Sequence, residues 1–172
     1  MLNRIVQIGV GVLLLLLVAC ESAPPPKKVP PKEDLIQYNQ QMAKKEGHQI
    51  EKYIERRGWD MTATGTGLYY RIYQRGQGTE TAKAGQHALV NFKVSLLDGS
   101  VVYSSKEKGA QEFLIERDDV ESGLHEGIKY MHIGDKATLI LPSHRAHGLL
   151  GDRNKIPPRS TVIYDLELLE LR

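Results

Sequence analysis

One stretch in the middle of the chain, residues 87–97, alternates between apolar and polar side chains with a period of two. This period is typical of a β-strand that buries one of its faces. The apolar positions are Ala88, Val90, Phe92, Val94 and Leu96. Asp98-Gly99 follows directly and favours a tight turn, so that residues 100–104 can return as a second strand. The pair predicts an antiparallel hairpin, which other parts of the chain must extend into a sheet.

The rest of residues 59–172 supplies further strands and one helix. Runs of alternating, aromatic or β-branched residues predict strands at 68–73, 113–115, 136–141 and 161–171. Leu124, Ile128 and Met131 lie four and three positions apart, which predicts one short helix over 120–131. Antiparallel strands with a single helix make an α+β domain, which we expect over residues 59–172.

Residues 33–58 have the pattern of a helical arm that precedes this domain. Glu33-Asp34 supplies acidic residues at the start, a partial apolar stripe follows, and Arg56-Arg57-Gly58 marks the end. The stripe is too irregular to predict a coiled coil. It can pack on the following domain or pair with a second copy, in a homodimer through residues 33–57, and the sequence does not choose between the two.

The first twenty residues have the pattern of a lipoprotein signal. Arg4 provides a positive charge, and the mostly apolar residues 5–19 form a stretch shorter than the roughly 17 to 25 residues of a membrane span. Leu17-Val18-Ala19-Cys20 resembles a bacterial lipobox, with a branched residue three positions before the cysteine and a small one directly before it. We therefore expect residues 1–19 to be removed as a signal peptide and Cys20 to be lipidated.

Residues 20–32 contain five of the eight prolines of the chain. Proline fixes an extended backbone with a rise of about 3.1 Å per residue, so this segment is expected to act as a tether between the lipid and the folded part. The mature protein is then anchored to a membrane of the cell envelope, with its domain on the periplasmic side.

Charge and cysteine content exclude several classes of function. The 23 basic and 21 acidic side chains give a net charge of +2 without a basic cluster, so we expect no nucleic-acid partner. A single cysteine excludes a disulfide within the chain and a zinc site with several thiolates. The scattered histidines have no fixed acidic neighbour, and no metal site is predicted. Ser143-His144 lacks the surroundings of a hydrolase nucleophile.

A series of short motifs runs from residue 67 to the end of the chain. They are Gly85-Gln86, Leu97-Asp98-Gly99, Ser104-Ser105, Gly127, Gly134-Asp135, Leu141-Pro142-Ser143, Ala146-His147-Gly148, Ile156-Pro157-Pro158 and residues 164–169. Together they resemble the FK506-binding-protein (FKBP) class of peptidyl-prolyl cis-trans isomerases. The lipobox, the helical arm, Trp59 and the run 148–152 are further similar to gliding-motility-associated isomerase lipoproteins.

The resemblance implies an antiparallel sheet curled around one short helix, with an apolar pocket for a proline side chain between them. The pocket positions that it implies are Phe92, Val102, Tyr103, Phe113, Val120, Glu121, Leu124, His147, Ile156 and Tyr164. Val102 stands where the family usually has an aromatic wall, and Tyr103 where it usually has an aspartate. His147 replaces a tyrosine that donates to the ligand; it either donates through a ring nitrogen or is a loop residue without a role. Glu121 is implied to act through its backbone N–H.

The function implied by the resemblance is rotation of X-Pro peptide bonds in exported proteins, which assists their folding and needs no metal or cofactor. Proline-containing segments of those proteins would then be the partners. The alternative is a binding module with the same fold and no useful turnover, acting as a membrane-tethered chaperone or assembly factor. The altered pocket positions favour the binding module, whereas the retained apolar lining favours the enzyme.

Overall fold

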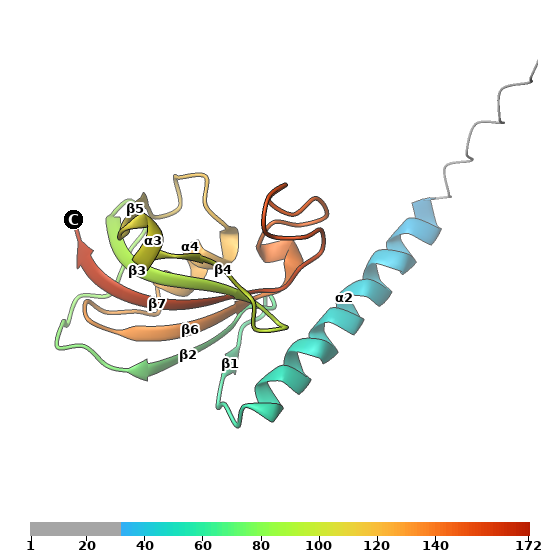
Figure 1. Ribbon diagram of the computed structural model, residues 1–172, viewed down its shortest axis with the longest axis horizontal. Coiled ribbons are helices and arrows are strands. Elements are labelled where there is room, and N and C mark those ends of the chain that lie inside the picture. The colour runs from blue at the N-terminus through green and yellow to red at the C-terminus, as the bar shows by residue number, and fades with distance from the viewer. Residues whose placement is uncertain (1–31) are drawn as a thin grey trace, which may run out of the picture. The chain divides into compact units, whose positions relative to one another are not determined.

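The computed structural model describes residues 32–172 (Figure 1). The signal peptide expected at 1–19, the lipidated Cys20 and all but the last residue of the tether expected at 20–32 lie outside the described residues. These three therefore stay predictions.

The described residues form three α-helices, a 3₁₀ turn and a sheet, in an order close to the one expected from the sequence. In chain order the elements are α2 (Lys32–Arg56), β1 (Thr62–Ala63), β2 (Tyr69–Gln74), β3 (His87–Leu96), β4 (Val101–Ser104), α3 (Ser105–Lys108), β5 (Gln111–Leu114), α4 (Ser122–Ile128), β6 (Lys136–Leu141), the 3₁₀ turn η2 (Ser143–Arg145) and β7 (Val162–Leu171). Within residues 32–172 the strands make one antiparallel sheet in the order β1-β2-β6-β7-β3-β4, with β5 paired to β3. The α+β architecture is confirmed.

Residues 87–96 form a strand that buries one of its faces, as their alternation predicted. Strand β3 pairs with β7 so that Val90 faces Leu168 and Val94 faces Tyr164, and all four side chains are buried on one side of the sheet. The expected turn follows, where Gly99 has a φ of 90° and its amide donates to the Leu96 carbonyl. A positive φ favours glycine because it has no Cβ. The hairpin of β3 and β4 is therefore confirmed.

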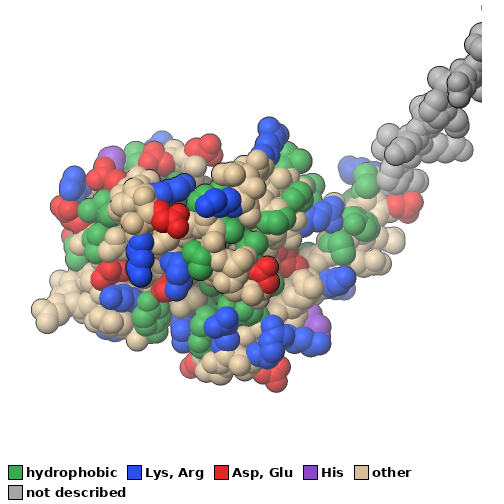
Figure 2. Space-filling view, in the orientation of Figure 1, with side chains coloured by type: hydrophobic (Ala, Val, Ile, Leu, Met, Phe, Trp, Pro, Cys, Tyr) green, Lys and Arg blue, Asp and Glu red, His purple; other side chains and the backbone are tan. Residues whose placement is uncertain are grey.

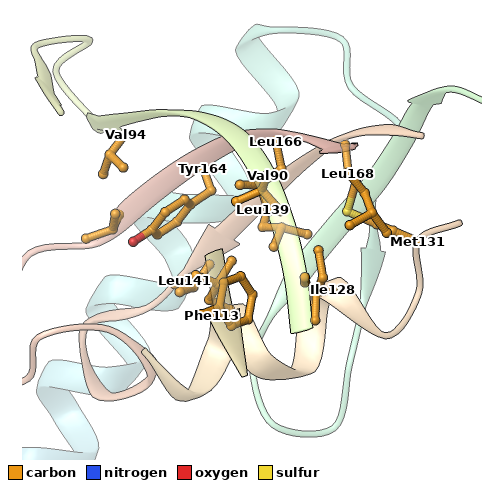
Figure 3. Packing of buried hydrophobic residues seen from close by; sticks show 14 of the residues in the cluster. Val90, Val94, Phe113, Ile128, Met131, Leu139, Leu141, Tyr164, Leu166 and Leu168 are labelled. Carbon is orange, nitrogen blue, oxygen red and sulfur yellow. The ribbon is translucent and has the colours of Figure 1, made fainter. Parts of the chain in front are cut away.

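Helix α4 lies directly against the sheet, as the cluster in Figure 3 shows. A Cβ added to Gly127 would lie 2.3 Å from Leu139 Cδ1, so a side chain there would push the helix away from β6. The helix is shorter than the expected 120–131. It starts at Ser122 because Glu121 still has an extended backbone, and Met131 is buried in the turn that follows. Three short elements were not predicted from the sequence: the single turns α3 and η2, and the two-residue strand β1.

The helical arm packs its C-terminal half on the other face of the sheet. Ile50 and Tyr53 of α2 form a second buried cluster with Ile140 and Ile163, which alternate with residues of the main core along β6 and β7. Glu46 adds polar contacts, since its carboxylate accepts hydrogen bonds from the Ser143 amide at 2.7 Å and from two hydroxyls. From Gln37 onward, α2 belongs to the same compact unit as the sheet.

This packing accounts for only part of the apolar stripe of α2. Tyr38 remains half exposed, with the Arg159 guanidinium 5.1 Å from the centre of its ring. Pairing of two copies through residues 33–57 stays a prediction, and a strictly monomeric mass of the full chain in light scattering would contradict it. Within residues 32–172 no helix combines the length and the apolar character of a membrane span.

The surface carries both signs of charge. On the face in view in Figure 2, Lys and Arg side chains are interspersed with Asp and Glu. Several of them are paired, such as Lys93 with Asp165 at 3.1 Å and Lys136 with Glu167 at 3.4 Å. This distribution agrees with the low net charge of the whole chain.

Candidate active site

Residues that the sequence places far apart meet on the side of the sheet that α4 covers. Eight of the ten expected pocket residues belong to one hydrophobic cluster; Val102, Phe113, Leu124, Ile156 and Tyr164 are buried in it, and Phe92, Tyr103 and Val120 pack against it while partly exposed. They come from β3, β4, β5, β7, α4 and the loops that precede α4 and β7. The partly exposed members mark the side from which a ligand can reach the cluster.

Phe113 forms an aromatic wall of this cluster. It lies on β5 opposite Ala88 of β3 and is only 4% exposed. Its ring makes an edge contact with the His125 ring of α4, with 5.8 Å between the centroids. Figure 3 shows Phe113 in the same cluster as Leu141 and Tyr164. The wall is therefore held from both the sheet and the helix.

The remaining two expected residues are Glu121 and His147, and the Glu121 side chain connects them to the cluster. One carboxylate oxygen lies 2.8 Å from His147 Nε2, and the two side chains are only 12% and 26% exposed. The buried Tyr164 hydroxyl is close enough to this carboxylate for its charge to act on the phenol. Burial raises the pKa of Tyr164 well above its ordinary value, and the charge of Glu121 raises it further. The phenol is therefore protonated at neutral pH. The resemblance suggested only a backbone role for Glu121.

A second polar contact joins strand β4 to the loop before β7 at the edge of the cluster. The Tyr103 hydroxyl on β4 donates to Asp152, a residue of the loop between η2 and β7. The other carboxylate oxygen of Asp152 accepts the amides of Asn154 at 2.8 Å and Ile156 at 2.7 Å. Asp152 was not among the residues expected in the site. The one available signal was the run 148–152, which was used only as a subfamily motif.

These elements coincide with a known domain. The family model described as FKBP-type peptidyl-prolyl cis-trans isomerase matches residues 78–169, which include all ten expected pocket residues. The chain belongs to this family. The FKBP assignment made from the motifs is therefore confirmed, together with the FKBP-like fold.

Bacterial members of the FKBP family are similar over most of this chain. The FKBP-type isomerase FkpA of Escherichia coli strain K12 is 34% identical over 122 residues, which are 71% of this chain and 43% of that protein. A probable FKBP-type isomerase of Haemophilus influenzae is 33% identical over 129 residues, covering 75% and 52%. The FKBP-type 22 kDa isomerase of E. coli K12 is 31% identical over 137 residues, covering 79% and 59%. The chain thus spans about half the length of these curated relatives.

Two hollows of the surface differ in whether they include any of the ten expected residues. A shallow hollow of about 700 Å³ is lined by His147 and Leu149–Arg153 and so borders the pocket at Asp152. A larger groove of about 780 Å³ lies between α2 and the loop before β7 and contains none of the ten residues. Of the ten expected residues, His147 lines the smaller hollow, which therefore adjoins the site, whereas the larger groove lies apart from it.

No metal centre accompanies this FKBP site in the described part of the chain. Within residues 32–172, no three His, Cys, Asp or Glu side chains gather as potential ligands. The arrangement instead offers a desolvated apolar surface with a few fixed hydrogen-bonding groups at its edge. Such a surface can bind a proline ring and orient the preceding amide.

Proposed function

We propose that this protein is a peptidyl-prolyl cis-trans isomerase that acts on X-Pro bonds of exported proteins and so assists their folding. The observation that carries the proposal is the convergence of the ten expected pocket residues around one apolar cluster inside an FKBP domain. Because the chain covers about half of its curated relatives, their activity supports the proposal by similarity of this domain alone.

The proposed mechanism needs shape and desolvation rather than covalent chemistry. Rotation about a peptide bond has a barrier of roughly 18 to 20 kcal/mol, because the planar amide is stabilised by resonance. In the rotation transition state the amide is twisted and its carbonyl is less polar. A dry pocket loses little by binding this form, whereas it disfavours the polar planar amide. Phe113, Ile156 and Tyr164 would surround the proline ring, and Glu121 would offer its backbone N–H.

The second candidate function is a binding module that holds proline-containing or unfolded segments without turnover. It is favoured by Val102, Tyr103 and His147, which depart from the usual FKBP residues at their positions. A membrane-tethered chaperone or assembly factor would need the same pocket but no preference for the twisted amide. The two functions therefore differ in turnover, not in fold.

Refolding experiments separate the two functions. We expect the full chain, at a concentration well below that of its substrate, to accelerate the slow refolding phase of a denatured protein limited by X-Pro isomerisation. Uncatalysed, this phase takes tens to hundreds of seconds. Suppression of aggregation only at equimolar concentration, with the slow phase unchanged, would favour the binding module instead.

We further propose that the protein is anchored in the cell envelope through a lipidated Cys20, with residues 21–32 as the tether. The support is the lipobox at residues 17–20 and the proline-rich composition that follows it. Several acyl chains, each contributing about 0.8 kcal/mol per buried methylene, give stable anchoring where a single chain is marginal. A part in gliding motility rests on the subfamily resemblance alone.

Replacement of the lipidation site tests the anchor. We expect Cys20→Ser to move the protein from the membrane fraction to the soluble fraction of the producing bacterium and to abolish labelling by a radioactive fatty acid. Ser104→Ala is the matched control, because it changes a residue of the domain and should leave fractionation unaltered. Membrane association that persists without label in a Cys20→Ser protein from which residues 1–19 have been removed would contradict lipid anchoring.

A further inference from the structure

The pocket contains a tyrosine where an FKBP domain usually has an acid. Tyr103 lies on β4 opposite Val94, and its ring packs on the main cluster. Its hydroxyl donates to the Asp152 carboxylate and also lies 3.3 Å from the Asn154 side-chain nitrogen. The Lys108 ammonium is 4.2 Å from the centre of the ring. The hydrogen bonds of this hydroxyl are therefore made to the loop between η2 and β7, which is called the late loop below.

The loop that carries Asp152 is folded around its carboxylate. Besides accepting the Asn154 and Ile156 amides, Asp152 donates its own amide to the Ile156 carbonyl at 3.2 Å. Gly151 has a φ of 65°, and a Cβ there would lie 2.1 Å from the same carbonyl oxygen. Ile156 is consequently turned into the cluster, with 2% exposure. One carboxylate fixes the turn and the side chain that lines the pocket.

The hydrogen bond between Tyr103 and Asp152 is strengthened by the negative charge of the Asp152 carboxylate. Burial acts to raise the pKa of Asp152, but the hydrogen bonds from Tyr103, Ile156 and Asn154 outweigh it and lower the pKa. The bond to Asp152 raises the pKa of Tyr103, and burial adds to the effect. At neutral pH an ionised carboxylate therefore accepts from a protonated phenol. Hydrogen bonds to charged acceptors are about twice as strong as neutral ones.

We propose that Asp152 is the positioning residue of the pocket. Although it lies in the late loop, it takes the role of the acid that is missing at position 103. This proposal rests on the proposed isomerase function. Asp152 joins β4 to the loop before β7, so it sets the separation between the Tyr103 and Ile156 walls. A fixed separation matters because a pocket that widens binds the twisted amide less selectively, whereas the planar substrate still finds apolar contacts. The loss should therefore affect kcat more than KM.

The test combines steady-state isomerisation kinetics with a double-mutant cycle in the full chain. In Asp152→Ala we expect kcat/KM to fall at least about tenfold, since misplacing pocket groups by about 1 Å can cost on the order of a hundredfold. The fall in kcat/KM should be smaller in Tyr103→Phe, because Asp152 still accepts hydrogen bonds from the two loop amides. Adding Tyr103→Phe to Asp152→Ala should cost little more, as expected for residues that act together. Asp152→Asn keeps an acceptor oxygen and should recover part of the loss.

Asp98→Ala is the matched control, because its carboxylate also accepts two local hydrogen bonds but at the β3–β4 turn. Its kcat/KM should equal that of the wild type, and urea unfolding should confirm that all variants are folded during the assay. An unchanged kcat and KM in Asp152→Ala, or losses that simply add in the double variant, would overturn the positioning role.

A second measurement distinguishes failure of the Asp152 proposal from failure of the proposed isomerase function. Hydrogen exchange of the Asn154 and Ile156 amides reports the loop directly, and Asp152→Ala should exchange them faster while leaving β3 and β7 protected. If the wild type lacks activity, the proposed function fails, and the exchange result still decides whether Asp152 fixes the loop. Unchanged protection of both amides in Asp152→Ala would contradict the proposal in either case.

Discussion

Replacing Phe113 with leucine is expected to lower kcat/KM for X-Pro isomerisation about tenfold, which corresponds to about 1.4 kcal/mol of lost transition-state stabilisation. Aromatic contacts contribute about 0.5 to 1.5 kcal/mol beyond the area that they bury, and leucine removes the flat wall while keeping most of the apolar volume. Phe113 is 4% exposed, so alanine would also cost about 3 to 5 kcal/mol of stability. Leucine is therefore the more informative change. The measurement is peptide isomerisation below the unfolding temperature of each variant.

Tyr53→Leu is the matched control for Phe113→Leu. Tyr53 is 5% exposed and packs in the second cluster, on the face of the sheet opposite the pocket. It should lose a comparable amount of stability without a change in kcat/KM. If Phe113→Leu stays folded and fully active, or if Tyr53→Leu loses as much activity, Phe113 does not line the site.

Asp135 is expected to contribute the largest single polar term to the stability of the domain. Its buried carboxylate accepts the amides of Gly76 at 2.8 Å and His132 at 2.9 Å, and the Arg75 guanidinium lies 2.9 Å away. Asp135→Ala leaves both amides without this partner, and each buried unsatisfied group costs about 1 to 3 kcal/mol. We expect the free energy of unfolding at pH 7 to fall by about 3 kcal/mol, measured with urea.

The lowered pKa of the Asp135 carboxyl predicts how the stability of the domain depends on pH. Burial acts to raise the pKa of Asp135, but the His132 and Gly76 amides and Arg75 outweigh it and lower the pKa. A carboxyl whose pKa is lower in the folded state stabilises the fold above its unfolded pKa of about 3.9, and this contribution is lost as the pH falls through the folded value. The difference in unfolding free energy between wild type and Asp135→Ala should therefore shrink below about pH 4.

Arg75→Gln separates the contribution of the Arg75 guanidinium from that of the two amides bound by Asp135. The Arg75 side chain is 63% exposed, so its removal should cost much less than the loss of the carboxylate. An equal loss in both variants would show that the guanidinium, rather than the two amides, accounts for the effect. A difference between wild type and Asp135→Ala that is constant from pH 7 to pH 3 would contradict the linkage.

Most of the fold could be predicted because its signals are local. The hairpin at residues 87–104 combines an alternating pattern with Asp98-Gly99, and both features act within a few residues. Strand β7 also alternates over part of its length, strand β6 is a mostly apolar run, and both were found close to their observed bounds. Helix α3 was missed because four residues leave no periodic pattern; a cap from the Ser104 side chain to the Lys106 amide helps to form it.

The candidate site could be predicted only as far as the family resemblance reaches. It supplied the positions of the apolar walls, and the structure brings them together. The contact of Tyr103 with Asp152 joins residues 49 positions apart, and that of Glu46 with Ser143 joins residues 97 apart. Neither pair has a local signal, because the partners meet only after β3, β4, β6 and β7 have assembled. Polar contacts of this kind require the tertiary structure.

The central claim is turnover of X-Pro bonds, and NMR exchange spectroscopy measures it most directly. Short peptides with different residues before proline, mixed with a small amount of the full chain, should show cis-trans exchange far faster than the uncatalysed tens to hundreds of seconds. The acceleration should saturate with peptide and disappear when a ligand of the apolar pocket is added. Exchange at the uncatalysed rate for every peptide, with the protein demonstrably folded, would contradict the isomerase function.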